Sequence, residues 1–251
     1  MKRSLVIPCL LVAIAFVACS KDVDSDSEDS GNQTINTVSV FGESTAFQSG
    51  EDIDSLLARG VLSVQAGNTH FFIGHRQVSD HDQDAIIAKY VDGQLAWART
   101  EFETTGDDSR GYGLVWDGSE NLYAVFSVTG TQGPMDADFR RFTTKGWIKN
   151  YGQGGGAKAA VLLKINPDHG EPQFGTFLIG KKSDGQTNSL EIKNISILNS
   201  GHVLIAADAW FSPLQTNQTI FTCEGNSPFD YSLEMRKDLS SAEHASAVGC
   251  H

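Results

Sequence analysis

The feature that most constrains the fold is a pair of short apolar runs joined by a tight turn. Its clearest example is "DAIIAKYVDGQLAWAR", residues 84–99, where Asp92 and Gly93 separate the two runs. An Asp-Gly pair favours a type I′ turn, because both central residues of that turn need positive φ. The segment therefore predicts a β-hairpin. The turn sets a register that pairs Tyr90 with Leu95, Ala88 with Trp97 and Ile86 with Arg99.

Similar hairpins recur along the chain, at residues 60–74, 111–130, 159–180 and 194–210. The equivalent turn residues Asn68, Asn121 and His202 are separated by 53 and 81 residues. Two insertions account for the difference: 22 residues lie within 129–156, and 6 lie in and near the longer turn "NPDHGE". Four short strands in about 50 residues, repeated, are typical of a β-propeller blade.

The repeats resemble the bacterial β-propeller repeats often labelled SBBP. The family's two half-units are similar to "DGSENLYAVFSVTG" and "DAIIAKYVDGQLAWAR" in this chain, and the resemblance covers about residues 60–210. It implies an architecture of four-stranded blades, and we accordingly interpret Asp84, Lys89 and Trp97 as architectural. It implies little about activity, because the members are mostly exported or surface proteins with no single assigned function.

We therefore expect an all-β fold: a β-propeller-like array of about three to four four-stranded blades. The chain holds about three and a half units, whereas propellers usually close with four to eight blades. The favoured solution is a small closed ring, in which the N-terminal run 37–47 completes a last blade built from residues 220–248. An open stack, a shortened relative of longer proteins and a β-sandwich remain alternatives. Around Ser240 and Glu243, a short capped helix competes with a strand.

The N-terminus predicts export. Lys2 and Arg3 precede an apolar run of 14 residues, 5–18, which is too short for a membrane-spanning helix of about 20 residues. A basic start, a short apolar run and a small residue before the break are typical of a secretory signal. We assign residues 1–18 to a signal peptide and expect no transmembrane helix after it.

The end of this segment, "FVAC", resembles the lipobox of bacterial lipoproteins, in which the cysteine carries lipid. Cys19 is the predicted site of lipidation, with palmitate as a labelling probe, although Phe16 stands where the family usually has Leu. Ordinary signal cleavage is the alternative. Residues 19–36 are acidic and serine-rich and are expected to form a disordered tether to a folded domain over 37–251. The opening "CSKD" resembles the export signal of surface lipoproteins in the Bacteroidota, so we expect an outer-membrane lipoprotein, periplasmic or surface-exposed.

Two cysteines remain after these assignments, Cys223 and Cys250, separated by 27 residues. In an oxidising compartment such a pair predicts a disulfide that holds the C-terminal segment. A zinc site is the less favoured interpretation, because it lacks a second closely spaced ligand pair.

The charge of the mature chain excludes one class of partner. Without the signal it has 17 basic and 31 acidic residues, a formal net charge of -14. Such a field repels phosphate backbones, so no nucleic-acid partner is expected.

Two short motifs suggest chemistry at first sight. "GESTA", residues 42–46, superficially resembles the elbow of serine hydrolases, but that elbow needs a strand, a strained turn and a helix. We therefore assign no catalytic role to Ser44. Asp80, Asp82 and Asp84 are weak candidates for metal ligands, with His75 and His81 nearby. They do not fit the EF-hand pattern, so a solvated acidic loop is the favoured interpretation and no metal or cofactor is expected.

The insertion, about residues 131–156, is the candidate ligand-binding loop, because insertions in repeat folds map to one face. It combines cations with aromatic rings, a combination that can hold an acidic glycan or a protein partner. The alternative is that the rings only pack the loop onto the sheets. The candidate residues are Arg140, Arg141, Lys145, Trp147, Lys149 and Tyr151.

These observations favour a lipid-anchored protein of the cell envelope that binds or scaffolds an unknown ligand. They favour a non-enzyme over an enzyme. One alternative is a polysaccharide-acting hydrolase or lyase, although the sequence does not single out its acid and base. The other is a shortened paralogue without function.

Overall fold

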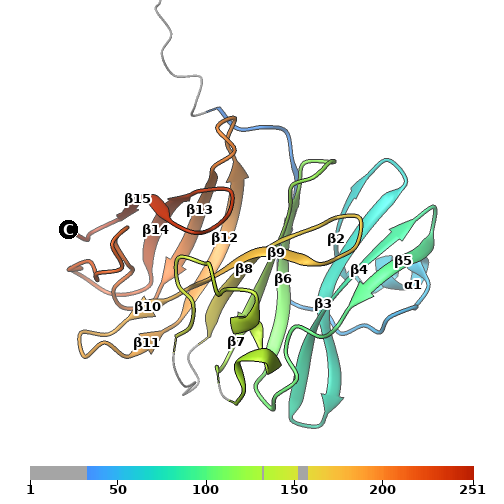
Figure 1. Cartoon of the computed structure of the whole chain (residues 1–251), viewed down its shortest axis with the longest axis horizontal. Coiled ribbons are helices and arrows are strands. Elements are labelled where there is room, and N and C mark those ends of the chain that lie inside the picture. The colour runs from blue at the N-terminus through green and yellow to red at the C-terminus, as the bar shows by residue number, and fades with distance from the viewer. Residues whose placement is uncertain (1–32, 132, 152–157) are drawn as a thin grey trace, which may run out of the picture.

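The computed structural model describes residues 33–131, 133–151 and 158–251. The fold is all-β, and its strands form antiparallel sheets. Three larger sheets stand side by side, with the chain passing from the first through the second to the third (Figure 1). This confirms the expected all-β fold class.

The first sheet contains β2 (Leu62–Ala66), β3 (Thr69–Ser79), β4 (Asp82–Val91) and β5 (Gln94–Arg99), in that order. Asp92 and Gly93 have φ of 51° and 76°, so the turn has the predicted positive φ values. Tyr90 pairs with Leu95 as predicted, but a bulge follows. Because Ala96 is the extra residue on β5, the remaining pairs are displaced by one position. They are Lys89 with Trp97, Ala88 with Ala98, and Ile87 with Arg99.

The second sheet has the order β1 (Val38–Phe41), β6 (Ser109–Trp116), β7 (Leu122–Val128), β8 (Ala159–Ile165) and β9 (Pro172–Leu178). Its central strands are buried on both faces, as expected for a sheet between two others. The N-terminal run, however, pairs with β6 through Val38–Trp116 to Phe41–Gly113. The prediction that this run completes the last sheet is therefore wrong.

The third sheet contains β12 (Leu190–Ile197), β13 (Val203–Ala209), β14 (Phe229–Met235) and β15 (Ala242–Ala247). The alternative of a short helix near Ser240 is wrong, because these residues turn between β14 and β15. A small sheet of β10 (Gly180–Lys181) and β11 (Thr187–Asn188) precedes it. Gln33 and Ile35 hydrogen bond to Asn199 and Ile197, so the folded domain includes residues assigned to the tether.

Polar side chains of the repeat tie the first two sheets together. The Lys89 ammonium and the Trp97 indole both donate to the carbonyl of Pro167, at 2.9 and 3.2 Å. Pro167 lies in the turn between β8 and β9, which is the part of the second unit equivalent to the Asp92-Gly93 turn. This supports the architectural interpretation of Lys89 and Trp97.

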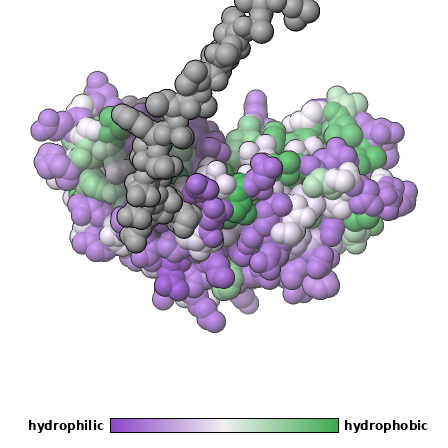
Figure 2. Space-filling model, turned by 90° about the horizontal axis from the view of Figure 1, so that it is seen from above, coloured by the Kyte–Doolittle hydropathy of each residue, from purple (hydrophilic) through white to green (hydrophobic). Residues whose placement is uncertain are grey.

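The outer faces of the first and third sheets differ in polarity and in what covers them. The outer face of the first sheet is apolar, and Phe47 and helix α1 (Ile53–Ala58) cover it, with Leu56 fully buried. Along β13 of the third sheet, buried and more exposed side chains alternate instead. Leu204, Ala206 and Asp208 lie on its outer, solvent-facing side. Figure 2 likewise shows mostly hydrophilic side chains on the upper face, with hydrophobic ones in scattered patches. Neither end sheet presents the broad apolar face that a further sheet would cover.

Candidate functional site

A cleft of about 620 Å³ lies between one end of the second sheet and the start of the third. Arg110 and Tyr112 reach it from β6, Ser44 from the segment after β1, and Trp210 from the end of β13. The Tyr112 hydroxyl accepts a hydrogen bond from the Ile192 amide at 2.9 Å and so joins the two sheets at its base. Burial raises the pKa of Tyr112, which keeps this hydroxyl neutral.

The cleft lining is polar and carries both signs of charge. Arg110 and Lys158 supply cations, whereas Glu43, Asp108 and Glu191 supply carboxylates. Hydroxyl and amide groups from neighbouring strands add further donors and acceptors, and Trp210 is half-buried. A hollow with an indole and many hydrogen-bonding groups suits a polar ligand that has some apolar surface.

A serine and a histidine meet at the edge of this cleft. Ser44 Oγ lies 3.0 Å from Nδ1 of His75, a buried residue of β3. Burial lowers the pKa of His75; nearby Arg110 also lowers it, and Asp108 raises it. A neutral imidazole in this position can accept the proton of the hydroxyl. The sequence analysis set Ser44 aside, and no local pattern indicates that His75, 31 residues away, is its partner.

The cations of the insertion divide into two groups. Arg140 pairs with the buried Asp138, and Arg141 donates to the carbonyl of Asp136 while lying over the Phe142 ring. Lys145 and Lys149 are exposed. Among the described cations of the insertion, Lys145 and Lys149 are therefore the exposed ones, and they remain candidates for contact with a partner.

The aromatic candidates of the insertion are used in packing. Trp147 is 6% exposed and donates to the Thr216 carbonyl at 3.0 Å, and Tyr151 is 7% exposed and donates to the Val128 carbonyl. Their rings do not form a platform for a ligand, which corrects the expected role of Trp147 and Tyr151. The physical reason is that the insertion covers an end of the second sheet and uses its rings to do so.

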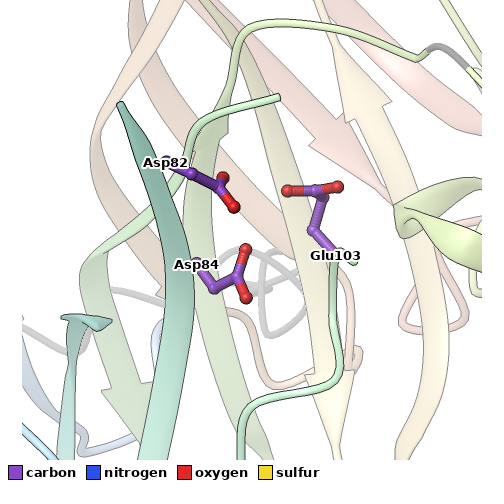
Figure 3. Close-up of side chains that lie close together, drawn as sticks. All are labelled: Asp82, Asp84 and Glu103. Atoms are coloured by element: carbon purple, nitrogen blue, oxygen red, sulfur yellow. The ribbon is translucent and has the colours of Figure 1, made fainter. Parts of the chain in front are cut away.

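The acidic candidates are brought together only in part. Ligand atoms of Asp82, Asp84 and Glu103 all lie within 4.8 Å of one another. Figure 3 shows the three side chains close together. Asp80 is exposed in the turn between β3 and β4 and is not a member of this group. The sequence analysis missed Glu103, because it lies on the connection between β5 and β6, far from the aspartates in sequence.

The disulfide between Cys223 and Cys250 is formed, with the two Cα atoms 4.0 Å apart. It holds the segment before β14 against the C-terminal residues, as predicted. Cys19, the signal peptide and residues 19–32 of the tether lie outside the described residues. Within the described ranges, no helix is long and apolar enough to cross a membrane.

No protein-family model matches this chain, and no curated protein matches it either. The cleft and the side-chain clusters are therefore interpreted from their own chemistry.

Proposed function

We propose that this protein is a lipid-anchored binding protein of the bacterial cell envelope, built from β-propeller-like repeats, which takes a glycan in its cleft. The single observation that carries the ligand proposal is the convergence of cations, hydroxyl groups and an indole on one hollow of about 620 Å³. The envelope location and the outer-membrane anchor rest on the signal, Cys19 and the acidic tether of the sequence.

The propeller-like arrangement is supported by the sheets themselves. Each of the three larger sheets contains four consecutive antiparallel strands, and the repeats in the sequence correspond to those of the first two sheets and to β12 and β13 of the third. Their side-by-side packing, with the chain passing from one sheet to the next, agrees with the SBBP-like resemblance. The outer face of the first sheet is covered by α1, and that of the third sheet faces solvent. Neither is built to pack against a further sheet, which favours a short open array over a closed ring.

The cleft chemistry favours a polyhydroxylated ligand such as a glycan. The indole of Trp210 offers an apolar surface of the kind on which a sugar ring stacks, and the hydroxyls of Ser44 and Ser127 suit a polyhydroxylated ligand. Arg110 supplies positive charge in a protein with a strong negative field. Arg110 and Lys158 could each pair with an acidic group of such a ligand, whereas Glu43, Asp108 and Glu191 could accept hydrogen bonds from its hydroxyl groups.

A glycan array followed by calorimetry tests this proposal. Trp210→Ala and Arg110→Ala should each weaken binding by about tenfold or more, because buried Trp and Arg contacts carry most of the energy at such sites. The matched control is the double variant Lys145→Ala and Lys149→Ala, which removes two exposed cations of the insertion and should bind normally. Loss of binding in the control alone would move the site to the insertion. Absence of binding to any glycan would favour a shortened paralogue.

The anchor is tested separately, in cells. Metabolic labelling with palmitate should disappear in Cys19→Ala and persist in the other variants. Labelling that survives this change would contradict lipidation at Cys19.

A polysaccharide-acting hydrolase is the second candidate. The Ser44–His75 hydrogen bond favours one that removes ester-linked acyl groups, because an activated serine attacks acyl carbonyls. Glu43 and Asp108 in the same cleft could supply further acid or base groups. A fluorophosphonate probe should then label the protein, and Ser44→Ala should abolish the labelling. Protein that never reacts with the probe would exclude a serine nucleophile while leaving glycan binding untouched.

A further inference from the structure

We propose that Asp82, Asp84 and Glu103 form a binding site for one hard divalent cation, with Ca²⁺ as the preferred ion. The inference does not depend on the identity of the cleft ligand. It rests on the geometry, the burial and the charge of this group of carboxylates.

The three side chains converge from two segments. Asp82 and Asp84 lie two residues apart on β4, so they point to the same side of the strand. Glu103 approaches from the connection between β5 and β6, and Figure 3 shows the three carboxylates directed toward a common space. One oxygen from each lies within 4.8 Å of the others.

Two of the three side chains are buried, Asp82 is half-buried, and each of the three has a carboxylate oxygen without a hydrogen-bond partner. Asp84 is 3% exposed and Glu103 is 2% exposed. Arg76 donates to Oδ2 of Asp84 at 2.7 Å, and the Thr105 amide donates to Oε1 of Glu103. Within the described ranges, Oδ1 of Asp82, Oδ1 of Asp84 and Oε2 of Glu103 are buried without a hydrogen-bond partner. A buried carboxylate oxygen without a partner is costly, and a cation in the shared space would satisfy all three.

The charge of the group matches one divalent ion. Three ionised carboxylates together with Arg76, the cation paired with Asp84, have a formal charge of -2. One divalent cation balances this charge, whereas the arginine alone does not.

The donor atoms select the class of ion. All are carboxylate oxygens, which suit Ca²⁺, Mg²⁺ or Mn²⁺ and not the nitrogen and sulfur preference of Zn²⁺. Ca²⁺ binds oxygen at about 2.3–2.6 Å, so it can join oxygens up to about 5 Å apart, whereas Mg²⁺ can join them only up to about 4 Å. The oxygens lie within 4.8 Å of one another, a spacing that Ca²⁺ can span.

The connection that carries Glu103 is held in place by the insertion. Phe102 packs with Phe126, Phe139 and Phe142, and the Thr104 amide donates to the Ala137 carbonyl at 2.8 Å. Arg76 pairs with Asp84 across β3 and β4. The three ligands are therefore positioned before any ion binds, which lowers the entropy cost of binding.

A proton is the competing occupant of this space. Burial, with the nearby charges of Asp84 and Asp82, raises the pKa of Glu103 to about 7. A protonated Glu103 could donate to Asp84 and satisfy two of the oxygens. The two occupants differ in their response to added metal, which an experiment can separate.

The test is calorimetry and thermal unfolding of the purified full-length protein, stripped with chelator and titrated with Ca²⁺, Mg²⁺ or Mn²⁺ at pH 7.5. Extracellular calcium modules bind at about 10⁻⁴–10⁻³ M, and we expect a single site in this range with Ca²⁺ tightest. Ca²⁺ at ten times Kd should raise Tm by about 3 to 6 °C.

Glu103→Gln keeps the shape of the side chain and should weaken Ca²⁺ binding by about tenfold or more. Asp80→Asn is the matched control, since it removes an exposed carboxylate from the adjacent turn, and it should bind as the wild type does. Glu103→Gln should remain folded, because it removes a buried negative charge, and its own unfolding curve verifies this. Absence of saturable binding of all three metals, or equal loss in the Asp80→Asn control, would overturn the proposal.

Discussion

Asp138 and the Asp84–Glu103 pair are both buried acidic sites, but they are satisfied to very different extents. Asp138 is 2% exposed, and its carboxylate accepts from the backbone amide and from the guanidinium of Arg140, at 2.7 to 2.9 Å. Asp84 and Glu103 are buried to the same degree, yet each keeps one oxygen without a partner in the described structure.

The difference reflects where the partner comes from. Arg140 is two residues from Asp138, so a short 3₁₀ turn, η3 (Phe139–Arg141), is enough to bring the opposite charges together. At the other site, two distant segments bring three acids together with one arginine. A buried ion pair balances its own charge and needs no further partner. An excess of buried negative charge is stabilised when a cation or a proton from solution binds to it.

Removing the paired acid should have the largest effect on stability. Asp138→Ala leaves the Arg140 guanidinium without its carboxylate and removes the side-chain cap of η3. We expect a loss of about 3–5 kcal/mol in the free energy of unfolding, measured by urea denaturation. A loss below about 1 kcal/mol would show that this ion pair contributes no more to the free energy of unfolding than an exposed pair does.

Glu103, one of the two buried acids with an oxygen that lacks a partner, should make the stability of the wild type fall as the pH rises. The pKa of Glu103 is raised from 4.5 to about 7, so the folded state binds more protons than the unfolded state between these values. Stability contributed by the protonated form is complete below pH 4.5 and is lost as the pH rises through 7. In chelator, the wild type should lose up to about 3 kcal/mol across this window.

Glu103→Gln cannot ionise and should show a flatter dependence of stability on pH over the same window. Urea denaturation at several pH values, in chelator, measures both curves. Parallel curves for the wild type and Glu103→Gln would show that Glu103 does not titrate with a raised pKa.

Asp82 gives a smaller effect, because it is only half-buried. Asp82→Asn relieves repulsion with the two neighbouring carboxylates, so metal-free protein should become more stable by up to about 1 kcal/mol. The same variant should bind Ca²⁺ more weakly. A stabilised protein with unchanged Ca²⁺ affinity would show that Asp82 lies near the ion without ligating it.

Exposed cations of the insertion should matter least. Lys145→Ala combined with Lys149→Ala removes charge from solvent-facing positions on the same segment as Asp138. The free energy of unfolding should change by no more than about 0.5 kcal/mol. A larger change would mean that these side chains, and not only Asp138 and the buried rings, hold the insertion in place.

Local sequence patterns were enough to predict the hairpins between residues 60 and 210 and the disulfide. These depend on local rules, namely the positive φ of Asp92-Gly93, alternating apolar runs and an isolated cysteine pair. The ion pair of Asp138 with Arg140 belongs to the same class, since its partners are neighbours in the chain, although the sequence analysis did not identify it.

The remaining features depend on how distant segments pack in the folded chain. The bulge at Ala96, the pairing of β1 with β6 and the burial of Trp147 follow from packing between sheets, which no local pattern records. Glu103 reaches Asp84, and Ser44 reaches His75, because connecting segments pack against strands that are separated from them in the sequence. Local chemistry sets which elements form, whereas the shared burial of distant segments sets which side chains meet, and the candidate sites of this protein depend on the latter.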